Sequence, residues 1–136
     1  MRKAAPILFA LLMVAVLVSP ASAAFDGSSN LLCAVVDVFE CGPENGCMES
    51  TAEGINIPQF IRIDFAGKTA MGTLPSKETR EVGIERMEQE GGALVIQGGQ
   101  QGRGWSVTIG EETGKMTMTA SGDRFGFVVF GACTVP

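Results

Sequence analysis

The stretch from Ala93 to Cys133, ALVIQGGQQGRGWSVTIGEETGKMTMTASGDRFGFVVFGAC, decides the fold predicted for this chain. It contains short apolar segments separated by Gly-rich connections, at residues 93–97, 105–109, 116–120 and 124–133. Short apolar segments at regular spacing, joined by such connections, are typical of an antiparallel meander. The stretch therefore predicts four antiparallel strands.

Apolar and polar side chains alternate along the middle segments. The apolar side chains that share a face are Trp105, Val107 and Ile109 in one segment and Met116, Met118 and Ala120 in the next. Successive side chains of a strand point to opposite faces, so each segment offers one apolar face to a core. Residues 124–133 are apolar on both faces, so we expect this strand either to be covered on both sides or to close a barrel against the first strand. Gly126 and Gly131 within it indicate a bulge or a close backbone approach.

Four further strands are expected upstream, at residues 31–39, 59–65, 69–73 and 78–90. Residues 78–90 carry the charges of an exposed helix, but the alternation of Val82 and Ile84 favours a strand that pairs with residues 93–97. In residues 31–39 the alternation predicts one apolar face, made of Leu32, Ala34, Val36 and Val38. Residues 24–30 are polar and are expected to form a frayed tail.

The expected fold class is all-β. We predict an antiparallel meander of about eight short strands, arranged as a barrel or barrel-like sandwich with a lipocalin- or calycin-like plan. A barrel of about eight strands is either just filled by side chains or holds one small ligand. The 136 residues have room for one such domain.

The first residues have the pattern of an export signal. Arg2 and Lys3 precede an apolar run over residues 4–18, and the small-residue triplet 21–23 follows Pro20. A membrane anchor is the alternative, but the run is shorter than the ~20 residues that a spanning helix needs. We therefore expect residues 1–23 to be a cleaved signal peptide and residues 24–136 to be a single periplasmic or secreted domain.

Four cysteines, Cys33, Cys41, Cys47 and Cys133, lie in the exported part. An even number of cysteines in a small exported domain predicts two disulfides, with three possible connectivities. We favour Cys41–Cys47 together with Cys33–Cys133. A metal site is not expected, because the chain has no histidine and no C-x-x-C pair.

The charge of the chain restricts its partners. Ten Lys and Arg residues include Arg2 and Lys3 of the signal, so the mature domain carries eight basic against 15 acidic residues, a net charge of −7. An acidic domain repels phosphate backbones, and we expect no nucleic-acid partner. No basic amphipathic face is present for anionic lipid, so stable membrane insertion after signal cleavage is not expected either.

The sequence predicts no catalytic residue, no cofactor and no metal ligand. Without histidine, a nucleophilic triad is excluded. The candidate carboxylates for acid–base work are Asp37, Asp64 and Glu85, which we expect to lie on solvated faces. Met116-x-Met118 has the soft thioethers of exported copper sites, but its alternation favours core filling.

Two features remain as candidates for binding. Residues 98–104 are Gly-rich like a phosphate-binding loop, but they lie between two strands and are expected to form a hairpin. Trp105 is the only tryptophan, and the chain has no tyrosine. We expect Trp105 to anchor the core, with a stacking platform for a ligand as the alternative, which makes it the one candidate binding residue.

Parts of the sequence resemble a known group of proteins. The runs Leu94-Val-Ile-Gln-Gly, Gly104-Trp105-Ser106, Glu112-Thr-Gly-Lys-Met-Thr and Phe127-Val-Val-Phe-Gly-Ala-Cys133 resemble small exported proteins of Gram-negative bacteria that end in Phe-Gly-x-Cys. The resemblance implies no activity. In plan the chain is also similar to periplasmic inhibitors of C-type lysozyme, although its Ser121-Gly122 is followed by Phe125 where that family has tyrosine. Lipocalins are a third comparison, with Arg103 at the place of the glycine in their Gly-x-Trp.

Together these observations favour a non-enzymatic binding module. It would hold either a protein partner on its loops or a small apolar ligand inside the barrel. The alternatives are a structural or envelope-associated protein with no ligand and, more remotely, a lysozyme-inhibitor-like protein. A cavity inside the barrel would favour the ligand carrier, and a filled interior would favour a structural role.

Overall fold

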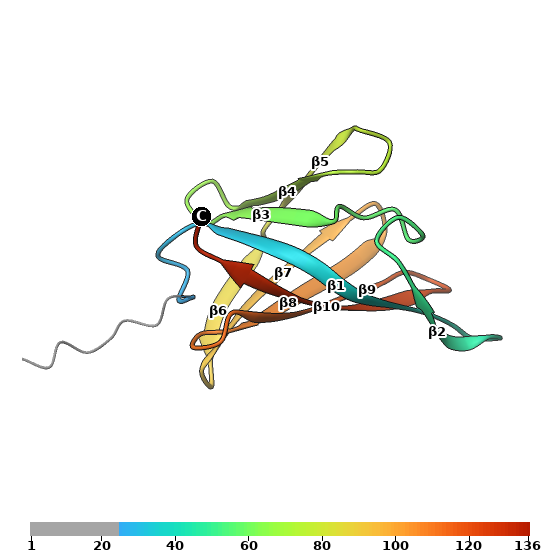
Figure 1. Cartoon of the computed structure of the whole chain (residues 1–136). Helices are drawn as coiled ribbons and strands as arrows, with labels where there is room; N and C mark the ends of the chain where they lie inside the picture. Colours follow the sequence, from blue (N-terminus) through green and yellow to red (C-terminus); the bar gives the residue numbers. More distant parts are fainter. Residues whose placement is uncertain (1–24) are drawn as a thin grey trace, which may run out of the picture.

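The computed structural model describes residues 25–136 of the chain, so the predicted signal peptide, residues 1–23, lies outside the described residues. The described part is all-β and antiparallel, as predicted (Figure 1). Its strands are β1 (Leu31–Gly42), β2 (Gly46–Ser50), β3 (Phe60–Asp64), β4 (Thr69–Thr73), β5 (Thr79–Gly83), β6 (Arg86–Glu90), β7 (Ala93–Gln100), β8 (Arg103–Gly110), β9 (Lys115–Ser121) and β10 (Gly126–Thr134).

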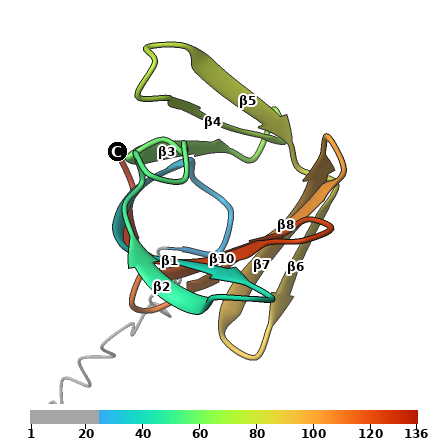
Figure 2. The ribbon, with the colours of Figure 1, turned by 90° about the vertical axis from the view of Figure 1, so that its right-hand side faces the viewer.

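One strongly curled sheet contains all these strands. Its order is β5-β4-β3-β1-β10-β9-β8-β7-β6, and β2 pairs with β1 outside this path. The last strand therefore pairs with the first, as predicted for residues 124–133. This pair lies in the middle of the path and does not close a barrel, because the sheet is open between its edges, β5 and β6. Seen along its axis, the sheet curls around its interior as a half-barrel (Figure 2).

The two edges of this path, β5 and β6, are consecutive in sequence. Only Ile84 and Glu85 separate them: the Ile84 amide donates to the Lys68 carbonyl at 2.8 Å, and the Glu85 amide donates to the Gln97 carbonyl at 2.9 Å. The chain thus crosses from the β3–β4–β5 side of the half-barrel to the β7 side. Residues 78–90 are extended, as predicted, but they form two strands instead of one. With β2, this split gives ten strands where about eight were expected.

The β6–β7 hairpin was predicted correctly. Its turn is Gly91-Gly92, and both glycines have positive φ, 57° and 81°. Positive φ at both central positions is the type I′ geometry, whose twist matches that of the two strands. The turn places Glu90 opposite Ala93.

The predicted apolar face of β1 was right for Val38 but wrong for the residues before it, Leu32, Ala34 and Val36. The buried side chains are Leu31, Cys33, Val35 and Val38, whereas Val36 is 67% exposed. The pairing of β1 with β10 shifts by one residue between Val35 and Asp37, and this bulge exchanges the two faces of the strand. A Cβ at Gly131, on the facing strand, would overlap the carbonyl oxygen of Ala34, so the predicted close backbone approach is confirmed there.

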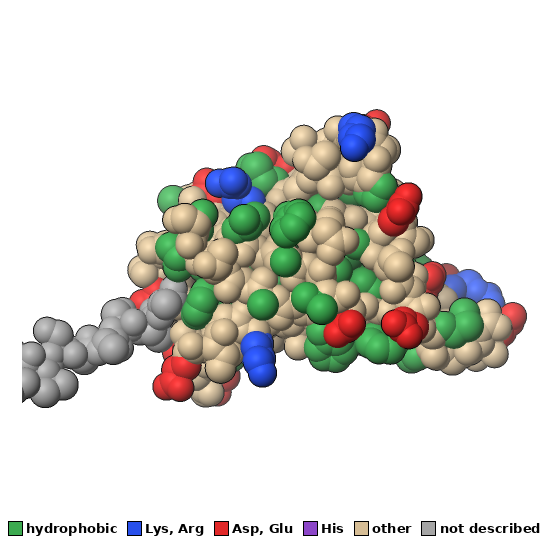
Figure 3. Space-filling model, viewed as in Figure 1, with side chains coloured by type: hydrophobic (Ala, Val, Ile, Leu, Met, Phe, Trp, Pro, Cys, Tyr) green, Lys and Arg blue, Asp and Glu red, His purple; other side chains and the backbone are tan. Residues whose placement is uncertain are grey.

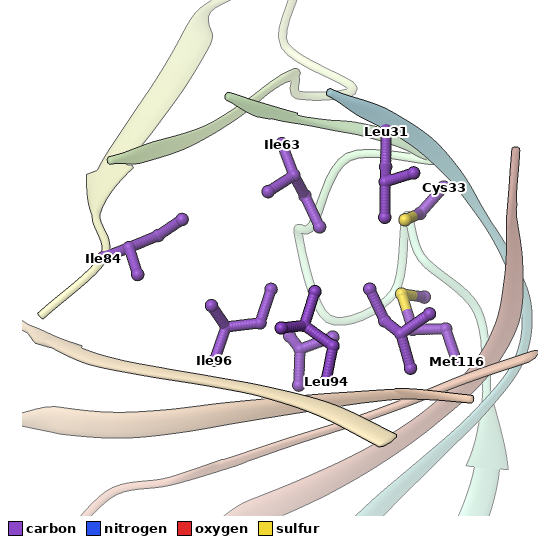
Figure 4. Packing of buried hydrophobic residues seen from close by; sticks show 9 residues of the cluster. Leu31, Cys33, Ile63, Ile84, Leu94, Ile96 and Met116 are labelled. Carbon is purple, nitrogen blue, oxygen red and sulfur yellow. The ribbon is translucent and has the colours of Figure 1, made fainter. Parts of the chain in front are cut away.

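The core lies on the concave side of the sheet and is apolar. In Figure 4, Ile63 and Leu31 project from one side of the interior towards Ile96, Leu94 and Met116 on the other. The expected fraying of residues 24–30 was wrong for Phe25, which packs against this cluster. A hydrogen bond of 2.8 Å from the Gln89 amide group to the Asp26 carbonyl holds the same segment against β6.

Two disulfides fix the sheet. Cys33–Cys133 joins β1 to β10, and Cys41–Cys47 joins β1 to β2, which is the favoured pairing. The first closes a sequence separation of 100 residues and the second a separation of 6. Disulfides persist in oxidising compartments, which indicates an extracellular or periplasmic environment.

The convex side of the sheet exposes several apolar side chains. Val36 on β1, Phe60 on β3 and Phe130 on β10 are 67%, 58% and 43% exposed. Figure 3 shows hydrophobic side chains interspersed with charged ones over this face. The outer side of β10 is therefore uncovered at Phe130, and the expected cover on both sides of this strand was wrong.

Candidate ligand-binding cavity

A cavity of about 140 Å³ lies on the concave side of the sheet, between β3–β5 and β7–β9. Its walls are almost entirely aliphatic, aromatic or thioether. The apolar lining residues are Ile57, Pro58, Ile61, Ile63, Ala70, Met71, Val82, Ile96, Trp105, Val107, Met116, Met118, Ala120 and Phe127. No Asp or Glu lines it among the described residues. Side chains therefore do not completely fill the concave side of the half-barrel.

Trp105 lies in the wall of this cavity because its neighbours are small. On β7 it pairs with Gly98, and on β9 with Ala120. A Cβ at Gly98 would overlap Cζ2 of the indole and would lie 2.7 Å from the Gly83 carbonyl oxygen. The indole therefore occupies the space that a side chain on β7 would otherwise fill.

The indole N–H of Trp105 is buried and has no hydrogen-bond partner among residues 25–136. No other side-chain N or O atom of the described residues is in this state. An unsatisfied buried donor costs about 1–3 kcal/mol, and native structures contain few of them. Trp105 thus contributes both a flat apolar surface and an unpaired donor next to the cavity.

Polar side chains gather at one end of the lining. Gln100, Gln101 and Arg103, at the tip of the β7–β8 hairpin, are exposed, whereas Ile96 and Val107 further along the same strands are buried. The cavity therefore opens towards this hairpin tip. Arg80 on β5, which is half-buried, completes the polar group. We call these four residues the mouth of the cavity.

Neither arginine at the mouth has a carboxylate partner in the described part of the chain. The ion pairs of the described residues join Arg86 to Glu88 and Arg124 to Glu44. Arg80 donates from Nη1 to the Asn56 carbonyl at 3.0 Å. The guanidinium of Arg103 lies 4.9 Å from the centre of the Phe125 ring, a cation–π geometry. Both guanidinium groups are held by neutral neighbours only.

The methionine pair and the three carboxylates considered from the sequence lie in different parts of the domain. Met116 and Met118 line the cavity and pack in the core, as the alternation indicated. The three candidate carboxylates do not converge. Asp37 is exposed on β1, Asp64 accepts from the Gly67 amide at 2.9 Å, and Glu85 accepts from the Gly99 amide at 3.2 Å.

The Gly-rich residues 98–104 form the β7–β8 hairpin, as predicted. Gln100, Gln101, Arg80 and Arg103 were not predicted to bind anything. The alternation does contain a signal for the two arginines. Arg80 is two positions from Val82 and Arg103 two positions from Trp105, so each lies on the same face of its strand as that apolar residue. A basic residue that continues an inward-facing apolar row is the pattern that would have found them.

Residues 25–136 contain no helix long and apolar enough to cross a membrane. In the same range, no three side chains among His, Cys, Asp and Glu form a group that could hold a metal ion. Comparisons of the chain with protein-family models, curated proteins and solved structures find no match. The cavity and its lining are the features that bear on function.

Replacing Trp105 by phenylalanine tests whether its donor is unsatisfied. The change removes the unpaired N–H together with a small apolar area, so the two effects offset each other, and we expect unfolding free energy within about 0.5 kcal/mol of the parent. Phe127→Leu removes apolar surface from the same cavity without removing a donor and is expected to cost about 1 kcal/mol or more. Urea denaturation followed by far-UV circular dichroism measures both. A loss of about 3 kcal/mol in Trp105→Phe would show that the N–H makes a stabilising hydrogen bond.

Proposed function

We propose that this chain is a non-enzymatic binding module that holds a small apolar ligand inside the curled sheet. We further propose that it acts in the periplasm or outside the cell, after removal of residues 1–23. The observation that carries the binding proposal is the cavity of about 140 Å³, whose walls are apolar and whose mouth is polar. Concave apolar sites with a few polar groups are the usual form of small-molecule sites.

The volume of the cavity limits the size of the ligand. An apolar cavity of roughly 150 Å³ stays free of water and binds benzene or xenon. The cavity here, at about 140 Å³, is of that size. The part of the ligand inside the cavity is therefore comparable to one aromatic ring or a short alkyl chain.

A neutral probe tests this proposal directly. Trp105 is the only tryptophan and lines the cavity, so its fluorescence reports on occupancy. Titration of the oxidised mature protein with 1-hexanol is expected to give a saturable change in emission. The absence of saturable binding would favour the alternative of a structural or envelope-associated protein with no ligand.

A cavity-filling variant links binding to the cavity. Ala70 on β4 lines the cavity, and Ala70→Leu places three more carbon atoms in it. We expect this variant to bind 1-hexanol at least about tenfold more weakly, because the occupied volume is no longer free. Ala132→Leu adds the same atoms at an exposed position of β10 outside the cavity and is expected to bind like the parent.

Circular dichroism and thermal unfolding of the two variants verify that both are folded. Unchanged binding in a folded Ala70→Leu would place the probe elsewhere and would contradict the proposal. Equal weakening in both variants would have the same consequence, because Ala132 does not line the cavity.

A further inference from the structure

We infer that the ligand of this cavity is an amphiphile with an anionic head group, held at the mouth by Arg80 and Arg103 with its apolar part inside. This inference rests on the proposed function and specifies its ligand class. It follows from the position, the partners and the charge of the two arginines.

The two arginines line the same cavity from different strands. Arg80 belongs to β5, at one edge of the sheet path, and Arg103 to the tip of the β7–β8 hairpin. Gln100, which pairs with Arg103, donates from Nε2 to the main-chain oxygen of Glu81 at 3.4 Å. Because Glu81 directly follows Arg80, this contact brings the hairpin tip to the part of β5 that carries the arginine. Figure 2 shows the β7–β8 tip next to the end of β5.

Both guanidinium groups keep hydrogen-bond donors free for a ligand. A guanidinium has five N–H donors, and Arg80 uses Nη1 for the Asn56 carbonyl. Arg103 donates to no acceptor among the described residues, and its face lies on Phe125. Stacking fixes the plane of the guanidinium and leaves its N–H edges open, which suits forked recognition of a carboxylate or phosphate.

The excess of acidic residues in the domain makes the absence of carboxylates around the two arginines a distinctive feature of the mouth. Acidic residues outnumber basic ones by 15 to eight in residues 24–136, so a basic side chain has carboxylates available as partners. Within residues 25–136, Arg80 and Arg103 have no carboxylate partner, and no Asp or Glu of that range lines the cavity. The outward-facing neighbour of Arg80, Glu81, is exposed on the other side of β5. The mouth is therefore a locally cationic opening to an apolar interior in an otherwise acidic domain.

Matched ligands separate the head group from the apolar part. The oxidised mature protein is titrated with 1-hexanol, hexanoate and hexyl phosphate, which share one alkyl chain, using Trp105 fluorescence. We expect at least one of the two anions to bind about tenfold more tightly than 1-hexanol, and to lose this advantage as salt is raised. Which anion binds more tightly distinguishes a carboxylate from a phosphate head group.

Variants of Arg80 and Arg103 test whether these two residues bind the anionic head group. Arg80→Gln and Arg103→Gln are each expected to weaken the preferred anion about tenfold and 1-hexanol less than twofold. Arg62→Gln is the matched control, because Arg62 is exposed on β3 and does not line the cavity. It is expected to change neither affinity.

The outcomes distinguish this inference from the proposed function. If none of the three ligands binds, the proposed function fails, and the inference fails with it. If 1-hexanol binds as tightly as both anions, or if the two arginine variants leave the anion-to-hexanol affinity ratio unchanged, the inference alone is overturned. Arg80→Lys and Arg103→Lys, which keep the charge, verify that loss of binding follows the charge rather than misfolding.

Discussion

Replacing Cys33 and Cys133 together by alanine is expected to lower the free energy of unfolding by about 5 kcal/mol. The bond closes a sequence separation of 100 residues, and cross-links over long loops constrain the unfolded chain most. It also joins β1 to β10, the pair through which the two halves of the sheet meet. Domains of this size have about 5–15 kcal/mol of total stability, so the variant loses a third of it or more.

The second disulfide supplies the matched control. Cys41→Ala with Cys47→Ala opens a separation of only 6 residues, and the same chain-entropy relation gives about 2 kcal/mol. Urea denaturation under non-reducing conditions measures both double variants against the parent. Equal losses in the two would mean that loop length does not set the contribution of these bonds. No loss in Cys33→Ala/Cys133→Ala would contradict a stabilising cross-link between β1 and β10.

Much of the curled sheet could be predicted because its signals are local. In β8 and β9 the alternation of Trp105, Val107 and Met116 with polar neighbours continues without interruption, and these side chains face the interior. Hairpin turns carry their own chemistry, as at Gly91-Gly92, where the backbone requires positive φ. Both the alternation of a strand and the residues of a turn are contained in a few consecutive positions. These strands and turns could therefore be predicted without knowing their distant partners.

The face of β1 could not be predicted in this way. Its sequence alternates regularly and places Val36 on the apolar face, yet Val35 is buried and Val36 is exposed. The bulge that exchanges the faces arises where β1 meets β10, next to Gly131, about a hundred positions away along the chain. The favoured bond from Cys33 to Cys133 was a hint, because it places Cys33 on the side of β1 that faces its disulfide partner. The sequence of β1 alone does not contain that information.

The candidate site shows the same division. Trp105 was identified as a candidate because a single tryptophan at the start of a strand stands out in the sequence. The two arginines of the mouth do not stand out in the sequence. Arg80 and Arg103 come together only when the link at Ile84 and Glu85 carries β5 towards the hairpin tip. A site assembled by the curling of a sheet has no contiguous signal in the chain.

Gly98 links the packing of the sheet to the shape of the cavity. Its pairing with Trp105 across β7 and β8 leaves no room for a Cβ, which would overlap the indole and lie 2.7 Å from the Gly83 carbonyl oxygen. Gly98→Ala must therefore displace either the main chain near Gly83 or the indole. We expect a loss of about 2–3 kcal/mol in unfolding free energy, as for overpacking of a tight site, together with a shift of Trp105 emission towards that of an exposed indole.

Gly99→Ala is the matched control for this change. It lies on the same strand one position further, and a Cβ there would be 3.5 Å from the nearest atom, the Arg103 carbonyl oxygen, which is ordinary contact. We expect a change within about 0.5 kcal/mol and unaltered emission. If Gly98→Ala displaces the indole, binding of 1-hexanol must fall with it, because Trp105 forms part of the cavity wall. A stable Gly98→Ala with native emission and full binding would show that the indole does not lie over Gly98, and the shape assigned to the cavity would be wrong.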